Sequence, residues 1–374
     1  MSTNPRIYLD FNATAPIAPA AREAIAAAVE VLGNPSSIHA EGRAARDVVE
    51  RARDRVATLA GRPREQVVFT SGGTESNALG VAALAAAVEA RGGPRVVATT
   101  PLEHPSLRAA VAALAARGWT VRELPPLAAA VGDLGGVGLL AAAAVNHELG
   151  TVLDPAVVAA ARAAGALVHL DAVQAAGKLA LGTVDADALA LSAHKLGGPQ
   201  GTGALILAHG AADDALPATG HQERGRRGGT ENVLGIAGFG AAAAALLPDP
   251  PATWAPVAER GARFEAALVD RLGARIHGAS APRIGGTINA AFPGAAGESI
   301  VIALDLAGVA VSTGAACTSG SVQPSPVLLG LGLPPSLARE AVRFSLGRTT
   351  TDAELDATLA LLPPIVDRAR RHRR

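Results

Sequence analysis

The chain has 374 residues, and its 33 acidic and 33 basic residues give a formal net charge of zero at pH 7. This balance gives no reason to expect a nucleic-acid-binding protein or attachment to an anionic membrane. A single cysteine, Cys317, excludes an internal disulfide and a cysteine-rich metal cluster, and we predict no metal ligands. The N-terminus lacks the layout of a signal peptide, and the longest apolar run, Leu234–Leu247, is too short to span a bilayer. We therefore expect a soluble, cytoplasmic protein.

Short apolar runs alternate with amphipathic segments through the first two thirds of the chain, which predicts a mostly parallel sheet with helices on both faces. The predicted strands are Ile7–Leu9, Gln66–Thr70, Arg95–Thr99, Trp119–Glu123, Gly138–Val145, Ala166–Leu170, Ala186–Leu191 and Gly203–Ala208. The predicted helices run from Pro19 to about Leu32, Glu41–Leu59, from Ser71 to about Ala90, Pro105–Arg117, Pro155–Ala164 and Glu231–Leu247.

The clearest change in composition is the stretch PDPPATWAP, where we place a domain boundary because the chain is too long for one compact core. We predict an N-terminal segment at residues 1–15, a large domain at 16–248 and a small α+β domain at 249–374. The elements predicted beyond the boundary are helices Val257–Leu272, Glu298–Leu306 and Asp352–Arg371, and strands near Arg275, at Thr287–Ala291 and at Ala341–Leu346.

Two polar residues end neighbouring predicted strands: Asp171 follows the run Ala166–Leu170, and Lys195 follows the run Ala186–Leu191. Ligands collect at such strand ends in open α/β sheets. Only two lysines occur in the chain, Lys178 and Lys195, so a surviving lysine suggests a need for a primary amine, which arginine cannot replace in a Schiff base.

Asp171 and Lys195, with Ser192 and His194 beside the lysine, suggest a site for pyridoxal phosphate (PLP). In such a site the lysine forms the imine and the aspartate keeps the pyridine nitrogen protonated. The alternative is a surface lysine and a strand-end aspartate that caps a loop, and this spacing alone does not decide between them.

The segment SGGTES, residues 71–76, lies between a predicted strand and a predicted helix. Its glycines allow close approach of an anion, and the helix start with the Thr74 hydroxyl can hold a phosphate. The segment lacks the lysine of a P-loop, so a single phosphate monoester fits better than a nucleoside triphosphate. Glycine-rich strand–helix turns are also common without any ligand.

Three further residues are candidates for chemistry. His104 follows a strand directly and can stack on a cofactor ring and move protons, or it is a loop histidine bonded to the backbone. Arg343, within an apolar strand, needs a carboxylate partner, which is either an internal aspartate or the α-carboxylate of a substrate. Cys317, between Gly314 and Gly320, suits a reactive thiol, although a lone cysteine is most often a small buried hydrophobe.

The chain resembles the NifS/IscS-type cysteine desulfurases, which are PLP enzymes of the class V aminotransferase group with the fold-type I architecture. The resemblance covers nearly the whole chain through motifs that occur in order: YLDFNATAP, GNPSSIH, VFTSGGTES, EHPS, VNHELG, HLDAVQAAGK, SAHKLGGPQGTGAL, QERGRRGGTEN, GAACTSG and VRFSLGR.

The resemblance implies a role for each matching residue. Lys195 would form the Schiff base, Asp171 would pair with the pyridine nitrogen, His104 would stack on the ring, and Cys317 would receive sulfur from L-cysteine as a persulfide. The remaining implied roles are phosphate binding by Gly73, Thr74, Ser192 and His194, with Thr230 reaching the phosphate from the second subunit of a homodimer; a hydrogen bond from Gln174 to the ring hydroxyl; and substrate carboxylate binding by Arg343 with Asn12 nearby.

Two departures from the family pattern affect these expectations. His147 stands where the family commonly has a second asparagine that touches the cofactor, so His147 either replaces that hydrogen bond or alters how the ring hydroxyl is held. The chain also ends soon after its last helix, so the longer tail with which relatives dock an iron–sulfur scaffold protein is expected to be absent.

We therefore expect a cysteine desulfurase that delivers sulfur to an unidentified acceptor protein, as in iron–sulfur cluster biogenesis. The alternatives are another PLP reaction, such as transamination, β-elimination of cysteine or selenocysteine cleavage, and a catalytically idle homologue that serves as a binding subunit.

Overall fold

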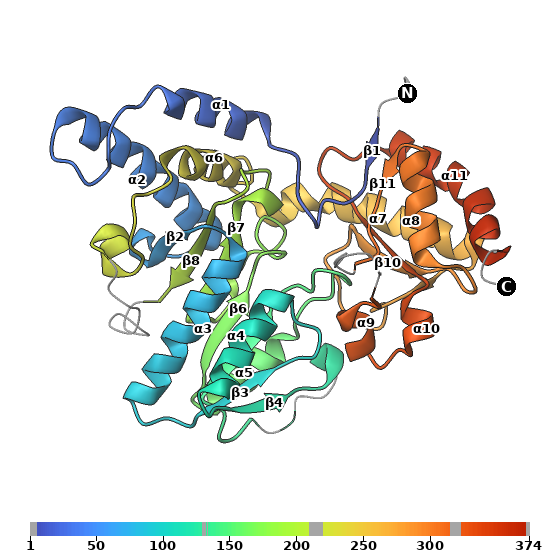
Figure 1. Cartoon of the computed structure of the whole chain (residues 1–374), viewed down its shortest axis with the longest axis horizontal. Coiled ribbons are helices and arrows are strands. Elements are labelled where there is room, and N and C mark those ends of the chain that lie inside the picture. The colour runs from blue at the N-terminus through green and yellow to red at the C-terminus, as the bar shows by residue number, and fades with distance from the viewer. Residues whose placement is uncertain (1–5, 129–131, 133, 209–219, 315–322, 372–374) are drawn as a thin grey trace. The chain divides into compact units, whose positions relative to one another are not determined.

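The computed structural model describes residues 6–128, 132, 134–208, 220–314 and 323–371, which form two compact units (Figure 1). The larger unit comprises Thr14–Val145 and Leu153–Thr253, and the smaller unit comprises Met1–Ala13, Asn146–Val152 and Trp254–Arg374, in each case without the residues outside the described ranges. The sequence predicted a division after residue 248 and gave no sign that Asn146–Val152 groups with the C-terminal residues.

The larger unit is built on a seven-stranded sheet with the strand order β2-β8-β7-β6-β5-β3-β4. β7, β6, β5, β3 and β4 run parallel to one another, whereas β8 is antiparallel to both β2 and β7. The prediction of a mostly parallel sheet is therefore confirmed. The strands are β2 (Val67–Thr70), β3 (Val96–Thr99), β4 (Thr120–Glu123), β5 (Leu139–Ala143), β6 (Leu167–Asp171), β7 (Ala188–Ser192) and β8 (Gly203–Leu207).

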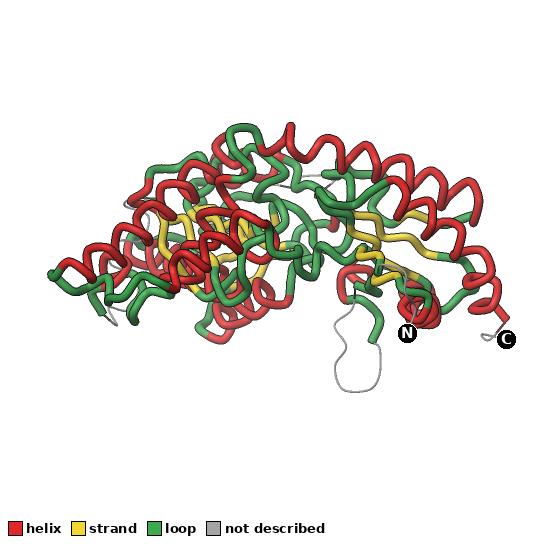
Figure 2. Tube along the Cα trace, turned by 90° about the horizontal axis from the view of Figure 1, so that it is seen from above, coloured by secondary structure: helices red, strands yellow, loops and turns green. Residues whose placement is uncertain are grey.

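Helices flank this sheet on both sides, as Figures 1 and 2 show. One helix, α3, packs along β6, β7 and β8 and beside α4, while α1 and α2 both pack against α6. Small residues permit this close packing: a Cβ on Gly240 of α6 would lie 2.6 Å from the Ala52 Cα of α2. The helices are α1 (Pro19–Val29), α2 (Ala40–Ala60), α3 (Gly73–Ala90), α4 (Pro105–Ala116), α5 (Pro155–Ala163) and α6 (Val233–Ala244).

The helix starts follow local rules that the sequence displays. Pro105 and Pro155 occupy the first position of α4 and α5, where the missing N–H costs nothing. The residue before each proline caps the helix through its side chain, which accepts a hydrogen bond from the backbone: His104 caps α4 and Asp154 caps α5. α2 ends at Gly61, whose φ of 61° is the left-handed conformation that glycine adopts readily.

The smaller unit contains an antiparallel sheet with the order β12-β10-β9 and a parallel pair, β1 and β11. Its helices α8 and α11 pack against each other, and α8 also packs on β12. The strands are β1 (Ile7–Tyr8), β9 (Arg275–Ile276), β10 (Thr287–Ala291), β11 (Val309–Ala310) and β12 (Ala341–Ser345), and the helices are α8 (Gly297–Leu306), α9 (Pro326–Gly330), α10 (Pro335–Ala338) and α11 (Asp352–Arg371).

The proline-rich stretch at the predicted domain boundary is largely helical. The helix predicted to begin at Val257 therefore begins earlier. Helix α7 spans Pro250–Leu272. Asp249 accepts a hydrogen bond from the Ala252 N–H, as a helix cap does, and two prolines in the first turn lose no intrahelical bond. Only Pro256 lies far enough inside to remove one.

Within the described residues, none of the helices is both long and apolar enough to cross a bilayer. The same residues contain no group of three or more His, Cys, Asp and Glu side chains arranged to hold a metal ion.

Candidate active site

The polar residues predicted to bind PLP lie at one edge of the large sheet. β3, β5, β6 and β7 are parallel, so their C-terminal ends meet at this edge, and Thr70 at the end of β2 pairs with Gly203 at the start of the reversed strand β8. Asp171 ends β6, and Ser192 ends β7 with Lys195 three residues later. This edge is the one at which open α/β sheets bind ligands.

The start of α3 lies directly against Ser192. A Cβ built on Gly72 would be 4.0 Å from the Ser192 Oγ, and one on Gly73 would be 3.6 Å from the Ser192 Cβ and only 2.6 Å from a methyl carbon of Val173. A larger residue at position 73 would therefore collide with its neighbours. The first N–H groups of a helix have no intrahelical acceptor, so Gly73 and Thr74 present donors at the positive end of a helix dipole.

Lys195 and His194 follow β7 in a short 3-10 turn, and both are half-buried. The Nδ1 atom of His194 lies 3.1 Å from the hydroxyl of Thr14. Burial and the nearby charge of Lys195 lower the pKa of His194 to about 4, so this imidazole is neutral at pH 7.

Asp171 is buried and both of its carboxylate oxygens accept hydrogen bonds. The Val173 backbone N–H donates to Oδ1 over 3.0 Å, and the side-chain amide of Asn77 donates to Oδ2 over 2.8 Å. These donors stabilise the ionised carboxylate, which is the form that can hold a pyridine nitrogen in its protonated state.

His104 lies close enough to both Asp171 and Lys195 for each charge to act on it. Burial lowers the pKa of His104, the carboxylate of Asp171 raises it, and the ammonium of Lys195 lowers it further. The three residues that the sequence singled out are thus gathered at the same sheet edge. The histidine side chain also caps α4, so the alternative of a backbone-bonded loop histidine describes the same residue correctly.

Gln174, in the turn after β6, accepts a 2.9 Å hydrogen bond from the Lys178 ammonium. Both side chains are buried. The Gln174 carbonyl oxygen is therefore oriented toward Lys178, and its amide nitrogen points the other way. This hydrogen bond holds the Lys178 ammonium within the turn that carries Gln174. The two lysines therefore have different roles.

The candidate substrate residues lie together in the smaller unit. Arg343 on β12 is buried and pairs with Asp10 over 2.7 Å, so an internal aspartate is one partner of its guanidinium. Its guanidinium also donates to the His147 carbonyl oxygen, while its Nε is buried without a hydrogen-bond partner among the described residues. Asn12 donates to the same carbonyl oxygen and to the Thr287 hydroxyl.

Glu148 contacts residues on both sides of the cysteine segment. Ser325 donates a 2.6 Å hydrogen bond to its carboxylate, and a Cβ on Gly314 would come within 2.5 Å of the same oxygen. Burial raises the pKa of Glu148 to about 7, against the opposing effects of the Ser325 hydrogen bond and the Arg343 charge. Cys317 itself lies outside the described residues.

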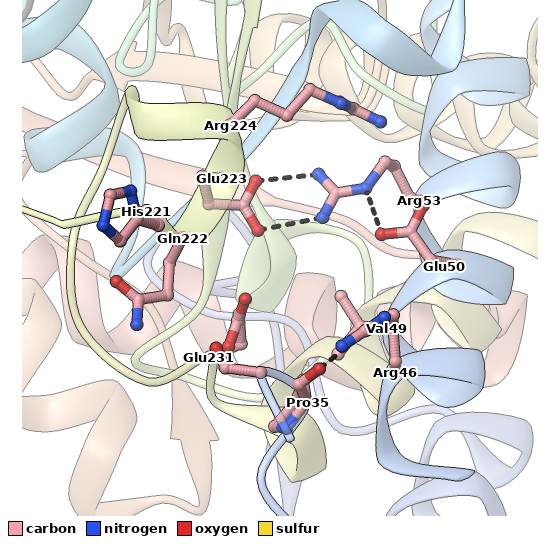
Figure 3. A pocket seen from close by; sticks show the side chains of 11 residues that line it. Pro35, Arg46, Val49, Glu50, Arg53, His221, Gln222, Glu223, Arg224 and Glu231 are labelled. Atoms are coloured by element: carbon pink, nitrogen blue, oxygen red, sulfur yellow. Dashed lines mark hydrogen bonds and ion pairs between the residues drawn. The ribbon is translucent and has the colours of Figure 1, made fainter. Parts of the chain in front are cut away.

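Thr230 is exposed and directly follows the loop of residues 221–229. A pocket of about 240 Å³ lies against this loop (Figure 3). On one side of it, Glu223 and Arg53 form a two-bond ion pair of 2.7 and 2.9 Å with both side chains at least 96% buried. Glu223 also accepts from the Phe69 N–H, and the Arg53 guanidinium lies 4.8 Å from the centre of the Phe69 ring.

Glu223 and Arg224 have φ angles of 47° and 58°, a left-handed conformation that costs a non-glycine residue about 1–2 kcal/mol. The buried ion pair and the hydrogen bond from the Phe69 N–H both hold Glu223 in this conformation. We expect Glu223→Gln to lower the free energy of unfolding by about 3 kcal/mol, because the buried Arg53 guanidinium then keeps only one carboxylate partner, Glu50, at 3.1 Å from its Nε. Thermal or denaturant unfolding of the variant measures this loss.

The matched control is the exposed pair of Arg263 and Asp352, whose side chains are 60% and 63% exposed. Asp352→Asn should cost less than about 1 kcal/mol. The double variant Arg53→Met with Glu223→Leu should be closer to wild type than either single change. Equal losses for Glu223→Gln and Asp352→Asn would contradict the assigned role of the buried pair.

Glu103, beside His104, is buried and accepts hydrogen bonds from the Thr100 hydroxyl over 2.6 Å and the Ala143 N–H over 2.8 Å. Burial raises the pKa of Glu103 from 4.5 to about 8; the Thr100 hydrogen bond opposes this shift and the Asp171 charge adds to it. The carboxyl group is therefore protonated in the folded protein and ionised in the unfolded chain across much of the physiological pH range.

A carboxyl with a raised folded-state pKa contributes stability that is complete below pH 4.5 and is lost as the pH rises to about 8. We expect wild-type stability, relative to Glu103→Gln, to fall by up to about 1.4 kcal/mol per pH unit in this window and to stay level above it. Denaturant unfolding at several pH values tests this, with the exposed Glu259→Gln as a control. Parallel stability curves for wild type and Glu103→Gln would show that Glu103 is ionised throughout.

Comparison with known proteins decides the family. The Aminotransferase class-V family model matches residues 7–358. The chain belongs to the class-V aminotransferase family. It is 40% identical to a cysteine desulfurase of Cereibacter sphaeroides over 98% of this chain and 97% of that protein, and 38% identical to a cysteine desulfurase of Nostoc sp. over 97% of this chain and 94% of that protein.

Solved structures agree with this assignment. A structure named NifS-like protein has a TM-score of 0.84 and 29% identity, and covers 97% of this class-V chain and 98% of its own. The structure of SspA in complex with cysteine has a TM-score of 0.77 and 26% identity, with 92% and 100% covered. This family member has the architecture of PLP fold-type I enzymes, and the resemblance drawn from its motifs is confirmed.

Several residues at the site were missed by the sequence reasoning, among them Asn77, Ser106, Glu103 and Asp10. Asn77 gave one signal: it lies three residues after Thr74, in the first turns of a helix that is otherwise rich in alanine. A polar residue on an otherwise apolar helix indicates a buried polar partner, which the structure shows to be Asp171. Asp10 gave none, because its contact with Arg343 joins residues 333 positions apart.

Proposed function

We propose that this class-V family member is a cysteine desulfurase, which converts L-cysteine to L-alanine and transfers the sulfur to Cys317 as a persulfide. The observation that carries the proposal is the gathering of Lys195, Asp171 and His104 at one sheet edge, next to a glycine-lined helix start. The identity of about 40% to named cysteine desulfurases over nearly the full chain supports the same activity.

The residues at the sheet edge fit PLP as the cofactor. The start of α3 offers N–H donors where a side chain at Gly73 would collide with Val173, and the Ser192 side chain lies next to it, which suits one phosphate monoester. The doubly hydrogen-bonded carboxylate of Asp171 suits a cationic pyridine nitrogen. Lys195 supplies the amine for covalent attachment, and Thr74, His194 and Gln174 are further proposed ligands.

When bound, PLP supplies an electron sink for the pair released as the substrate's Cα–H bond breaks. The side chains of the protein supply the proton transfers and the stabilising charge. Lys195 would accept a proton at its Nζ and return it, and the negative charge of Asp171 would favour a proton on a ring nitrogen bound beside it. His104 would lie beside the ring.

The sulfur transfer needs no oxidant or reductant besides the substrate and Cys317. The Cys317 thiolate attacks the substrate sulfur, an S–S bond forms, and the substrate's Cβ–S bond breaks with its electron pair going to carbon. A proton completes the methyl group of alanine, so the carbon gains two electrons and each of the two sulfurs in the new S–S bond loses one. A thiolate is required because a neutral thiol is a poor nucleophile.

Arg343 is proposed to bind the substrate α-carboxylate, with Asn12 and the neighbouring His147 helping to shape the site. Support comes from the buried Nε of Arg343, which has no hydrogen-bond partner among the described residues, and from the shared contacts of Arg343 and Asn12 on the His147 carbonyl oxygen. The pairing with Asp10 leaves this donor for a ligand.

A homodimer in which Thr230 reaches the phosphate of the second subunit's cofactor is also proposed. Thr230 is exposed on its own chain, and large apolar side chains of the same unit are exposed as well, with Val29, Leu32 and Ile38 at 61%, 79% and 88%. Exposed apolar groups mark an interaction surface when they form one contiguous patch, and these three lie within ten positions of one another along the chain. The sulfur acceptor is proposed to be a separate protein in the cytoplasm that serves iron–sulfur cluster biogenesis.

The functional division is proposed to follow the predicted domains, with PLP bound by the large domain at 16–248 and the cysteine carried by the small domain at 249–374. Product analysis tests the activity itself. A desulfurase gives one alanine per sulfur removed from L-cysteine, with persulfide on the protein before any reductant is added. Pyruvate or another keto acid in place of alanine would identify a β-lyase or an aminotransferase instead.

A further inference from the structure

A continuous chain of hydrogen bonds connects Asp171 to His104 through two residues that the proposed chemistry does not use. The Asn77 amide nitrogen donates to the Asp171 carboxylate over 2.8 Å and to the Ser106 hydroxyl over 3.0 Å. The Ser106 hydroxyl lies 2.8 Å from the His104 Nδ1. His169, buried in β6, ends the chain on the other side, with its Nε2 at 2.9 Å from the Asn77 carbonyl oxygen.

The chemistry of the end groups fixes the direction of every bond in this chain. An ionised carboxylate only accepts, so the amide nitrogen of Asn77 must face Asp171 and its oxygen must face His169. His169 then donates from Nε2 and is neutral, in line with burial, which lowers its pKa to about 3. On the other branch the Ser106 oxygen accepts from Asn77, and its own proton can be donated to the His104 Nδ1 if that nitrogen carries none.

A second donor reaches the same nitrogen. The Ser106 backbone N–H points at the His104 Nδ1 over 3.2 Å, in the geometry of a helix cap. A backbone N–H can only donate, so Nδ1 must be an acceptor whatever the hydroxyl does. The single proton of a neutral imidazole at position 104 therefore resides on Nε2.

Protonation of both ring nitrogens would break the bond from the Ser106 backbone N–H and set two N–H groups against each other, and the Ser106 hydroxyl would have to turn from donor to acceptor. His104 also lies at the N-terminus of α4, a helix of 12 residues whose dipole disfavours a cation there. Of the charged groups that act on the ring, Lys195 opposes a cation and only Asp171 favours one.

We propose that Asn77 and Ser106 are positioning residues that hold the His104 proton on Nε2, so that His104 serves as a neutral hydrogen-bond donor and Lys195 carries the transferred protons. The catalytic role given to His104 in this inference rests on the proposed function. The position of its proton on Nε2 does not depend on that function. Neutral imidazole donors stabilise developing negative charge in other enzymes whose histidine lies at a helix N-terminus.

Nitrogen NMR of the full chain, with the histidines labelled and PLP bound, measures the placement of the proton. His104→Asn removes one of nine histidines and so identifies the His104 signals. Near neutral pH the Nδ1 signal should be that of an unprotonated nitrogen and the Nε2 signal that of a protonated one. Ser106→Ala should raise the pKa of His104 by about one pH unit, because one acceptor bond of the neutral form is lost, and Ser106→Thr should restore it.

Two isosteric variants separate a donor from a proton relay in turnover. His104→Gln keeps an N–H near the position of Nε2, whereas the shorter His104→Asn keeps the acceptor that caps the helix and places no N–H at the position of Nε2. A donor role predicts that His104→Gln stays within about tenfold of wild type and that His104→Asn loses about 10²–10³ in kcat. Equal losses of about 10²–10⁴ for both would establish a relay and overturn the inference.

A proton on Nδ1, or on both nitrogens near neutral pH, would also overturn it, as would a Ser106→Ala variant with an unchanged His104 titration. These outcomes are independent of the product assay. A protein that makes pyruvate from cysteine can still hold the proton on Nε2, and a true desulfurase can still place it elsewhere.

Discussion

Replacing Lys195 with alanine should abolish both the visible absorbance of covalently held PLP and the formation of alanine from L-cysteine. The amine at this position is the proposed point of attachment and the proposed carrier of protons, and arginine could not replace it. Loss of the proton carrier alone is worth about 10²–10⁴ in rate, and loss of the covalent anchor adds to it. Absorbance spectra and alanine yield measure the two effects separately.

The chain offers a matched control because it contains only one other lysine. Lys178 is buried and donates to Gln174, so Lys178→Met should keep the visible absorbance even if it weakens PLP binding. A Lys195→Ala protein that still gained the absorbance of attached PLP would show that the cofactor amine had been assigned to the wrong residue.

Replacing Cys317 with serine should leave the PLP absorbance intact and stop the release of sulfur from L-cysteine. A serine hydroxyl is far less nucleophilic than a thiolate at neutral pH, so we expect a loss of about a hundredfold or more in turnover. Because Cys317 is the only cysteine, any persulfide found on the protein by thiol labelling has a single possible position.

L-cysteine that still binds to the serine variant should change the PLP absorbance without yielding alanine. Cys317→Ala is the control for a structural effect of the hydroxyl. Full activity of either variant with L-cysteine would exclude the persulfide step and would favour direct elimination of sulfide, as in a β-lyase.

The strands and helices that position the cofactor site follow from local sequence patterns. Short apolar runs with polar residues at their ends marked β6 and β7, and Pro105 after His104 marked the start of α4. The site residues Asp171 and Lys195 stood out because each is a polar residue just past the end of a buried strand. Parallel strands bring such ends together, so this part of the site was predictable.

Contacts between distant parts of the chain were not predictable in this way. Arg343 needed a carboxylate, but the choice of Asp10 depends on β1 and β12 lying close in the smaller unit. The hydrogen-bond chain through Asn77 and Ser106 forms only because α3, α4 and β6 lie close to one another in the folded chain. Likewise, Pro250 and Pro251 suggested a break, although two prolines fit the first turn of α7 once Asp249 caps it.

Reduction of the PLP-loaded protein with borohydride, followed by peptide mass spectrometry, tests the proposed site at its chemical centre. Reduction converts the linkage between cofactor and lysine into a stable bond, and only two lysines can carry it. We expect the cofactor mass on the peptide that contains Lys195 and none on the peptide that contains Lys178. Cofactor on Lys178, or on neither peptide of an active enzyme, would contradict the proposed site.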